Sequence, residues 1–179
     1  MKSVIFDLDG VLADLIKGLA ARDGYDEPTA WFINNIKDVA GDVLIFKAIE
    51  NHVHSGLFRN LPTMPHHNEV KKLISTLHNN GHQIKILTSC MDHEYSDIIA
   101  NDKREWIKTH FADVYHCFKQ IDVVKGSKLK INYVDKHEVL IDDYTKTQQQ
   151  FIEHGKGDQF ILYKGFDDCV KQLKQKKFI

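Results

Sequence analysis

The chain has 179 residues, of which 42% are hydrophobic and 27% charged, and its formal net charge at pH 7 is −1. These values are typical of one globular domain with a substantial core. They exclude a protein that neutralises a long phosphate backbone, because lysine and arginine are not in large excess.

The first predicted element is a buried strand that ends in two acids. An apolar run over residues 4–6 leads to Asp7 and Asp9, and Gly10 then allows a sharp turn. Alternation places the two carboxylates on one side of the strand, where they repel each other by on the order of 4 kcal/mol at an effective dielectric of about 20. The pair therefore predicts a site for a cation or for proton transfer; the alternative is a surface turn.

The chain between this strand and the next is far longer than a crossover needs. The next strand is predicted at 84–88, and an amphipathic helix at 65–79 is sufficient to connect the two. We therefore interpret residues 15–62 as a small helical cap over the carboxyl ends of the strands, where open α/β sheets bind ligands. The alternative is extra helices on the sheet edge. The predicted core comprises residues 1–14 and 63–179.

The rest of the chain alternates predicted helices and strands. The expected elements are a helix at 98–111, a strand at 114–118, a short helix after 126–128, a strand at 139–143, a helix at 147–154, a strand at 160–162 and a helix from about 167. Such alternation predicts a parallel sheet between two helical layers, a three-layer Rossmann-like α/β fold.

Several further features bear on location and metal chemistry. No apolar stretch is long enough to span a membrane, and Met1-Lys2 leads into a strand rather than a signal peptide. Cys90, Cys117 and Cys169 are unpatterned, which predicts reduced thiols, and we expect a cytoplasmic protein. The histidines lack zinc-protease spacing and are interpreted as surface residues.

Polar residues also stand at the ends of two later strands. The hydroxyls of Thr88 and Ser89, and the backbone amides after them, can donate hydrogen bonds to a phosphate oxygen; a helix cap is the alternative. Asp142 and Asp143 follow another apolar run and repeat the paired acids of the first strand. All of these side chains are expected at one edge of the sheet.

A lysine completes the pattern. Lys128 follows Gly126-Ser127 and can supply a fixed positive charge to the same phosphate. Lys125 and Lys130 are the alternatives. The order Asp-x-Asp, Thr-Ser, Lys and Asp-Asp predicts that four distant segments converge on one site.

This order resembles the four motifs of the haloacid-dehalogenase-like (HAD) phosphatases. The first motif reads Asp-Leu-Asp-Gly-Val-Leu-Ala-Asp, and with residues 56–62, 103–107 and 140–143 it is similar to the 5'(3')-deoxyribonucleotidases. The resemblance implies a HAD-like fold and a phosphomonoesterase that uses Mg²⁺ and an aspartyl-phosphate intermediate. Its implied substrate is a (deoxy)ribonucleoside monophosphate.

The resemblance also implies roles for single residues. Asp7 attacks phosphorus, and Asp9 acts as acid and base. Mg²⁺ is expected on Asp7, on the backbone carbonyl of Asp9, and on Asp142 or Asp143, a set of oxygen ligands that suits this ion. The implied phosphate-binding residues are Thr88, Ser89 and Lys128.

The predicted cap contributes aromatic side chains for the leaving group. Trp31, Phe46 and Phe58 can stack on a base, and Arg59 can hydrogen-bond a base edge. Packing inside the cap is the alternative for each aromatic. Phe58 is the strongest candidate because it lies in a stretch that resembles the family.

Two other functions remain open. One is a HAD phosphatase for another small phosphomonoester or a polynucleotide 3'-phosphate. The other is a HAD-like protein that binds a phosphorylated ligand without turnover; the intact Asp9 argues against it, because binding does not need that acid. The expected partner is a small phosphomonoester, not a membrane or long nucleic acid, and a homodimer remains open.

Overall fold

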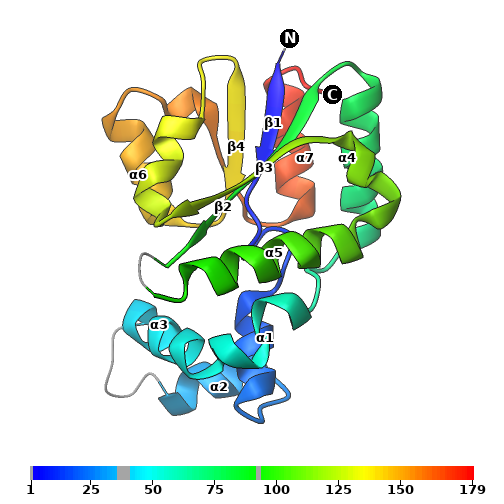
Figure 1. Ribbon diagram of the computed structural model, residues 1–179. Helices are drawn as coiled ribbons and strands as arrows, with labels where there is room; N and C mark the ends of the chain where they lie inside the picture. The colour runs from blue at the N-terminus through cyan, green and yellow to red at the C-terminus, as the bar shows by residue number, and fades with distance from the viewer. Residues whose placement is uncertain (1, 36–40, 92–93) are drawn as a thin grey trace.

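The computed structural model describes residues 2–35, 41–91 and 94–179. Its centre is a five-stranded parallel sheet with the strand order β3-β2-β1-β4-β5 (Figure 1). The strands are β1 (Ser3–Phe6), β2 (Gln83–Cys90), β3 (Phe118–Lys125), β4 (Glu138–Asp142) and β5 (Phe160–Leu162). The order reverses direction between β1 and β4, and ligands of open α/β sheets bind outside the carboxyl ends at such a point.

Helices cover both faces of the sheet, which confirms the predicted three-layer α/β fold. The helices after β1 and its insertion are α4 (His67–Asn79), α5 (Ser96–His110), α6 (Thr145–Glu153) and α7 (Phe166–Gln175). Val4 and Phe6 of β1 belong to one core cluster, with residues of α4, α5 and α7. Ile5 belongs to the other, with Phe151 of α6 and residues of the 3₁₀ helix η5 (Ser127–Tyr133). Alternating side chains of one strand therefore serve two apolar cores.

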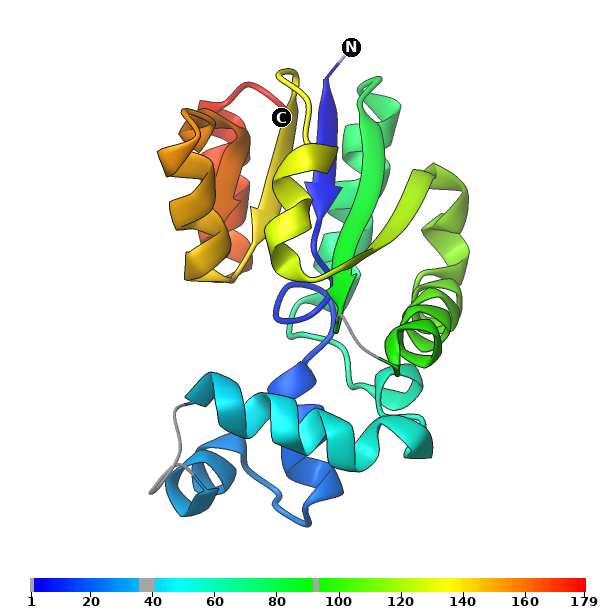
Figure 2. The same cartoon turned by 60° about the vertical axis from the view of Figure 1, so that its left-hand side comes forward.

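The insertion after β1 forms a group of helices beyond the carboxyl ends of the strands (Figures 1 and 2). It contains α1 (Leu15–Arg22), α2 (Pro28–Asn35), α3 (Gly41–His52), η2 (Val53–Ser55) and η3 (Phe58–Asn60). The helices described within 15–35 and 41–62 do not lie along a sheet edge, and the segment is called the cap below. Its position leaves the strand ends facing the cap.

One predicted strand is wrong. Residues 112–117 form the 3₁₀ helix η4 (Ala112–Cys117), and β3 begins only at Phe118. Val114 and Cys117 are buried, and their three-residue spacing matches one turn of a 3₁₀ helix. The real strand lies at the sheet edge and exposes several side chains, so it lacks the apolar run of the central strands.

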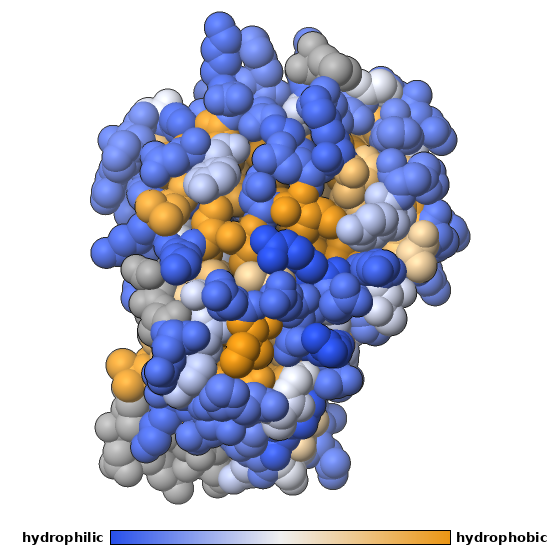
Figure 3. All heavy atoms as spheres, viewed as in Figure 1, coloured by the Kyte–Doolittle hydropathy of each residue, from blue (hydrophilic) through white to orange (hydrophobic). Residues whose placement is uncertain are grey.

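Within the described ranges, no helix is both long and apolar enough to cross a bilayer. The face drawn in Figure 3 is mostly polar, with apolar atoms exposed in patches between hydrophilic residues.

Candidate active site

The end of β1 places a buried carboxylate at the centre of the sheet. The backbone N–H of Asp7 donates to Ile141 O at 2.9 Å, which continues the pairing with β4. Asp7 is 5% exposed, and its Oδ1 accepts a hydrogen bond from the N–H of Leu8 at 2.7 Å. The chain turns at Gly10, where φ is +75°, and a Cβ at this position would overlap the carboxylate of Asp143. A glycine is therefore required for the two acidic segments to approach.

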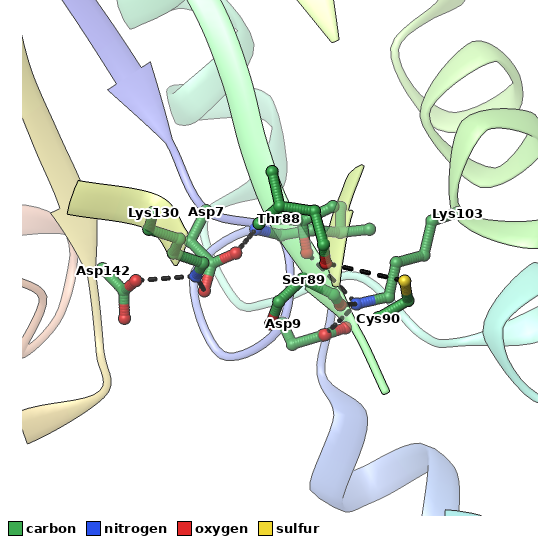
Figure 4. A network of polar contacts seen from close by, with 10 residues as sticks. Asp7, Asp9, Thr88, Ser89, Cys90, Lys103, Lys130 and Asp142 are labelled. Atoms are coloured by element: carbon green, nitrogen blue, oxygen red, sulfur yellow. Dashed lines mark hydrogen bonds and ion pairs between the residues drawn. The ribbon is translucent and has the colours of Figure 1, made fainter. Parts of the chain in front are cut away.

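Lys130 joins the acids of β1 and β4. Its Nζ lies 2.7 Å from Asp7 Oδ2 and 2.7 Å from Asp142 Oδ2, and all three side chains are buried (Figure 4). Burial alone lowers the pKa of a lysine, but the charges of Asp7 and Asp142 outweigh it and hold the pKa of Lys130 above its ordinary value. The ammonium is therefore a fixed positive charge.

The predicted phosphate-binding lysine, Lys128, is not the lysine that contacts the acids. It is exposed and lines a cavity at this end of the sheet, and the structure brings its alternative, Lys130, to the acids. The cause is the 3₁₀ geometry of η5, in which side chains three residues apart lie on the same side of the helix. Lys128 and Lys130 are two residues apart and therefore point to different sides. Lys125 is also exposed.

Three carboxylates gather at the ends of β1 and β4. Asp7, Asp142 and Asp143 each offer an oxygen within 4.8 Å of the others. Burial, followed by the charge of Asp7, raises the pKa of Asp142 to about 6. Asp143 is exposed at the surface of the site, but partial shielding from water, followed by the charges of Asp7 and Asp142, still raises the pKa of its carboxyl to about 7. Three acids beside the single ammonium of Lys130 leave an excess of negative charge. The donor set therefore fits a hard divalent cation such as Mg²⁺.

This charge excess predicts an unusual pH dependence for the metal-free protein. The raised pKa values mean that folded Asp142 and Asp143 still bind protons at pH values where the unfolded chain has lost them. The two acids therefore favour the folded state most below about pH 4, and this contribution to the free energy of unfolding is lost as the pH rises to about 7. We expect Asp143→Asn to gain stability relative to the wild type over this range. Urea unfolding in EDTA measures the difference; a difference that is constant or falls with pH contradicts the assignment.

Asp9 faces a different cation. Its carboxylate is not part of the three-acid group, and its Oδ2 pairs with Nζ of Lys103, a buried residue of α5. Burial raises the pKa of Asp9, and the charge of Lys103 opposes this without cancelling it. The pKa of Asp9 therefore lies above that of an exposed aspartate. The predicted contact of its backbone carbonyl with a metal ion stays a prediction.

The end of β2 supplies the predicted hydroxyls. Thr88 is fully buried and Ser89 is half-buried and lines the cavity. Lys103 Nζ donates to Thr88 Oγ1 at 3.1 Å and to Ser89 O at 2.6 Å. Sequence reasoning assigned no role to Lys103, and its only signal was its place in the 103–107 stretch of the resemblance.

These groups line one end of a cavity of about 940 Å³ between the cap and the sheet. Its size is near the upper end of the range for small-molecule sites. The other walls are largely apolar; the cap contributes Leu15, Ile16, Ile45, Phe46 and Ile49. A charged reaction centre therefore adjoins an apolar compartment.

The four predicted substrate-binding residues divide into two groups. Phe46 and Phe58 line the cavity, and Phe46 is 49% exposed. Trp31 is instead fully buried within the cap, where its Nε1 donates to Asp23 Oδ2 at 2.6 Å. Arg59 pairs with Asp102 of α5 at 2.8 Å and is not among the cavity-lining residues. Trp31 thus packs inside the cap and Arg59 forms an ion pair with α5, and neither side chain faces the cavity.

Comparison with known proteins shows the fold. No protein-family model matches the chain, and no curated protein matches it. A haloacid dehalogenase-like family hydrolase from Streptococcus pneumoniae has 15% identity and a TM-score of 0.51, with 96% of this chain and 90% of that chain covered. A proposed phosphatase from Clostridium difficile has 17% identity and a TM-score of 0.50 over the same shares. The chain therefore has a HAD-like α/β fold.

Proposed function

We propose that this protein is a Mg²⁺-dependent phosphomonoesterase that dephosphorylates nucleoside monophosphates. The observation that carries the proposal is the convergence of Asp7, Asp142, Asp143 and Lys130 at the strand ends, beside a cavity of about 940 Å³. The HAD-like fold and the similarity of the first motif to deoxyribonucleotidases support it.

In this proposal, Asp7 and Asp9 share the chemical work. A carboxylate oxygen of Asp7 attacks phosphorus, the bond to the leaving oxygen breaks, and Asp9 gives that oxygen its proton. Water then attacks the phosphorus of the aspartyl-phosphate and gives a proton to Asp9, the bond from phosphorus to the Asp7 oxygen breaks, and inorganic phosphate leaves with the Asp7 carboxylate restored. The burial that raises the pKa of Asp9 favours the protonated form that the first step needs.

Other groups hold the phosphate during both steps. In the proposal, Ser89, at the cavity wall, and the remaining N–H donor of Lys130 bind phosphate oxygens as charge moves among them. A bound Mg²⁺, held by the three acids, would neutralise charge on the phosphate and draw electrons from phosphorus.

The apolar compartment supports a nucleoside as leaving group. Phe46 presents a half-exposed ring to the cavity, and the aliphatic side chains beside it form a wall against which a flat base can lie. The polyhydroxylated body of a sugar phosphate gains less from such a wall. Of the predicted substrate-binding residues, Phe46 and Phe58 therefore stay the proposed determinants of the leaving group, and Arg59 does not.

Phosphate release from a panel of monophosphates tests the proposal. The panel contains dUMP, dTMP, the other 5'- and 3'-nucleotides, sugar phosphates, small aryl phosphates and a 3'-phosphorylated oligonucleotide. We expect kcat/KM to be highest for nucleotides, and EDTA to lower turnover by about 100-fold or more, because a metal ion contributes several kcal/mol to such a transition state.

Each other outcome has a distinct meaning. A preference for sugar phosphates rejects the nucleotide while keeping the phosphatase, and full turnover in EDTA rejects the metal. Nucleotide binding in Mg²⁺ without phosphate release favours a protein that binds phosphorylated ligands without turnover.

A further inference from the structure

We infer that Lys103 is a positioning residue, which holds the carboxyl group of Asp9 against the end of β2 and does not itself bind the phosphate. The inference rests on the proposed function, because Asp9 acts there as acid and base. It adds a lysine from the middle of α5 to a site otherwise made from the ends of strands and from η5.

The first argument is the number of hydrogen-bond donors. Lys103 Nζ contacts Asp9 Oδ2, Thr88 Oγ1 at 3.1 Å and Ser89 O at 2.6 Å (Figure 4). A lysine ammonium has three N–H donors, so these acceptors use all of them. Lys130 contacts two acceptors in the described part of the chain and keeps one donor for a ligand. The two buried lysines therefore have different tasks.

The second argument is the burial of the ammonium. The side chain of Lys103 is 1% exposed, and its Nζ lies 4.9 Å from the ring centroid of Phe58. The aromatic ring covers the charge and adds a cation–π attraction. With water kept away, the attraction between Lys103 and Asp9 is stronger than at an exposed site.

The third argument is the attachment of α5 on both sides of Lys103. Asp102 pairs with Arg59 at 2.8 Å, and Trp106 Nε1 donates to Leu61 O at 2.7 Å. These contacts join α5 to the chain segment that leads from the cap back to the core. The backbone that carries Lys103 is therefore fixed relative to the site.

Among the residues that the structure describes, Lys103 is the side-chain partner of the Asp9 carboxyl group. Asp9 lies between β1 and the turn at Gly10, and its Oδ1 is buried without a hydrogen-bond partner among the described residues. The pairing of Oδ2 with Lys103 is thus the contact that orients its carboxyl group. A misplacement of about 1 Å at a reacting group costs on the order of 100-fold in rate. Loss of Lys103 should therefore lower kcat, with little effect on phosphate binding.

A double-mutant cycle between Lys103 and Asp9 tests the inference. Lys103→Met keeps the length of the side chain and removes the charge, and we expect it to lower kcat by about 100-fold in the wild type. In the Asp9→Asn background the same change should lower kcat by less than about 3-fold, because the group it positions is gone. The affinity for inorganic phosphate, measured by calorimetry, should stay within about 3-fold of the wild type.

Two further variants complete the experiment. Lys85→Met is the matched control, because it removes another shielded ion pair, Lys85–Glu138 at 2.7 Å, outside the site, and should keep full turnover. Lys103→Ala opens space for an added alkylammonium ion, and saturable recovery of kcat is expected. This recovery of kcat still tests the inference if the Lys103→Met variant does not fold.

The contrary results are distinct. Phosphate affinity that falls about 10-fold or more with Lys103→Met makes Lys103 a phosphate ligand and overturns the inference. Equal losses of kcat in both backgrounds, or no loss in the wild type, also overturn it while the phosphatase stands. Absence of phosphate release by the wild type overturns the proposed function and this inference together.

Discussion

Asp7→Asn is expected to abolish phosphate release while the protein stays folded. The variant keeps the size of the side chain and the acceptor for the N–H of Leu8, but its amide is not a nucleophile. Removal of a nucleophile typically costs at least about 10⁴-fold in kcat. The amide weakens the pairing of residue 7 with Lys130 but also relieves the repulsion between Asp7 and its acidic neighbours Asp142 and Asp143, so we expect the cooperative unfolding transition to be kept.

The measurement is phosphate release with Mg²⁺, followed by thermal unfolding of the same sample. Asp113→Asn is the control, because this acid is exposed, pairs with Lys71 on the surface and lies outside the site. The control should keep wild-type turnover. An Asp7→Asn protein with more than a few per cent of wild-type kcat contradicts the assignment of the nucleophile.

Lys130→Met is expected to have the largest effect on stability among single changes in the site. Lys130 is 2% exposed and contacts Asp7 and Asp142 at 2.7 Å each, so its removal leaves two buried carboxylates without their cation. Breaking a buried pair in this way costs about 3–5 kcal/mol of unfolding free energy. Turnover should fall by about 100-fold or more, because a fixed charge beside the nucleophile is also lost.

Lys128→Met is the matched comparison for this prediction. The two lysines are two residues apart in η5, but Lys128 is exposed and should change the unfolding free energy by less than about 0.5 kcal/mol. Urea unfolding in EDTA and phosphate release in Mg²⁺ give both values. If Lys128→Met damages activity as much as Lys130→Met, the lysine of the site has been misassigned.

The strands that carry acids could be predicted because their sequences are unambiguous. Both β1 and β4 are apolar runs that end in aspartates, and central strands of a parallel sheet are buried on both faces. The edge strand β3 gave no such signal, since its exposed side chains interrupt the pattern and the buried residues before it belong to a 3₁₀ turn. A strand at the edge of a sheet has a weaker apolar pattern, and whether a strand lies at the edge is decided by the whole sheet and not by its own residues.

The lysines of the site were harder to predict for a different reason. Lys125 is the last residue of β3, and whether Lys128 or Lys130 reaches the acids depends on the winding of η5, in which side chains two residues apart point to different sides. Lys103 lies within a helix that also carries many surface charges, so only its tertiary contacts distinguish it.

The cap residues show the same dependence on tertiary contacts. Arg59 was a reasonable ligand for a base, but Asp102 of α5 takes its guanidinium. Trp31 was a reasonable stacking platform, but its ring fills the interior of the cap and its N–H is bound by Asp23. Partners that are distant in sequence, Asp102 above all, cannot be recognised from the local pattern.

The central claim, that Asp7 accepts the phosphoryl group, is tested most directly by stopping the reaction with acid during turnover. The protein is then digested, and its peptides are examined by mass spectrometry. We predict a phosphoryl group on the peptide that contains Asp7, formed with Mg²⁺ and substrate and lost when substrate is exhausted. Steady turnover with no phosphorylated peptide, or with the phosphoryl group on another residue, would contradict it.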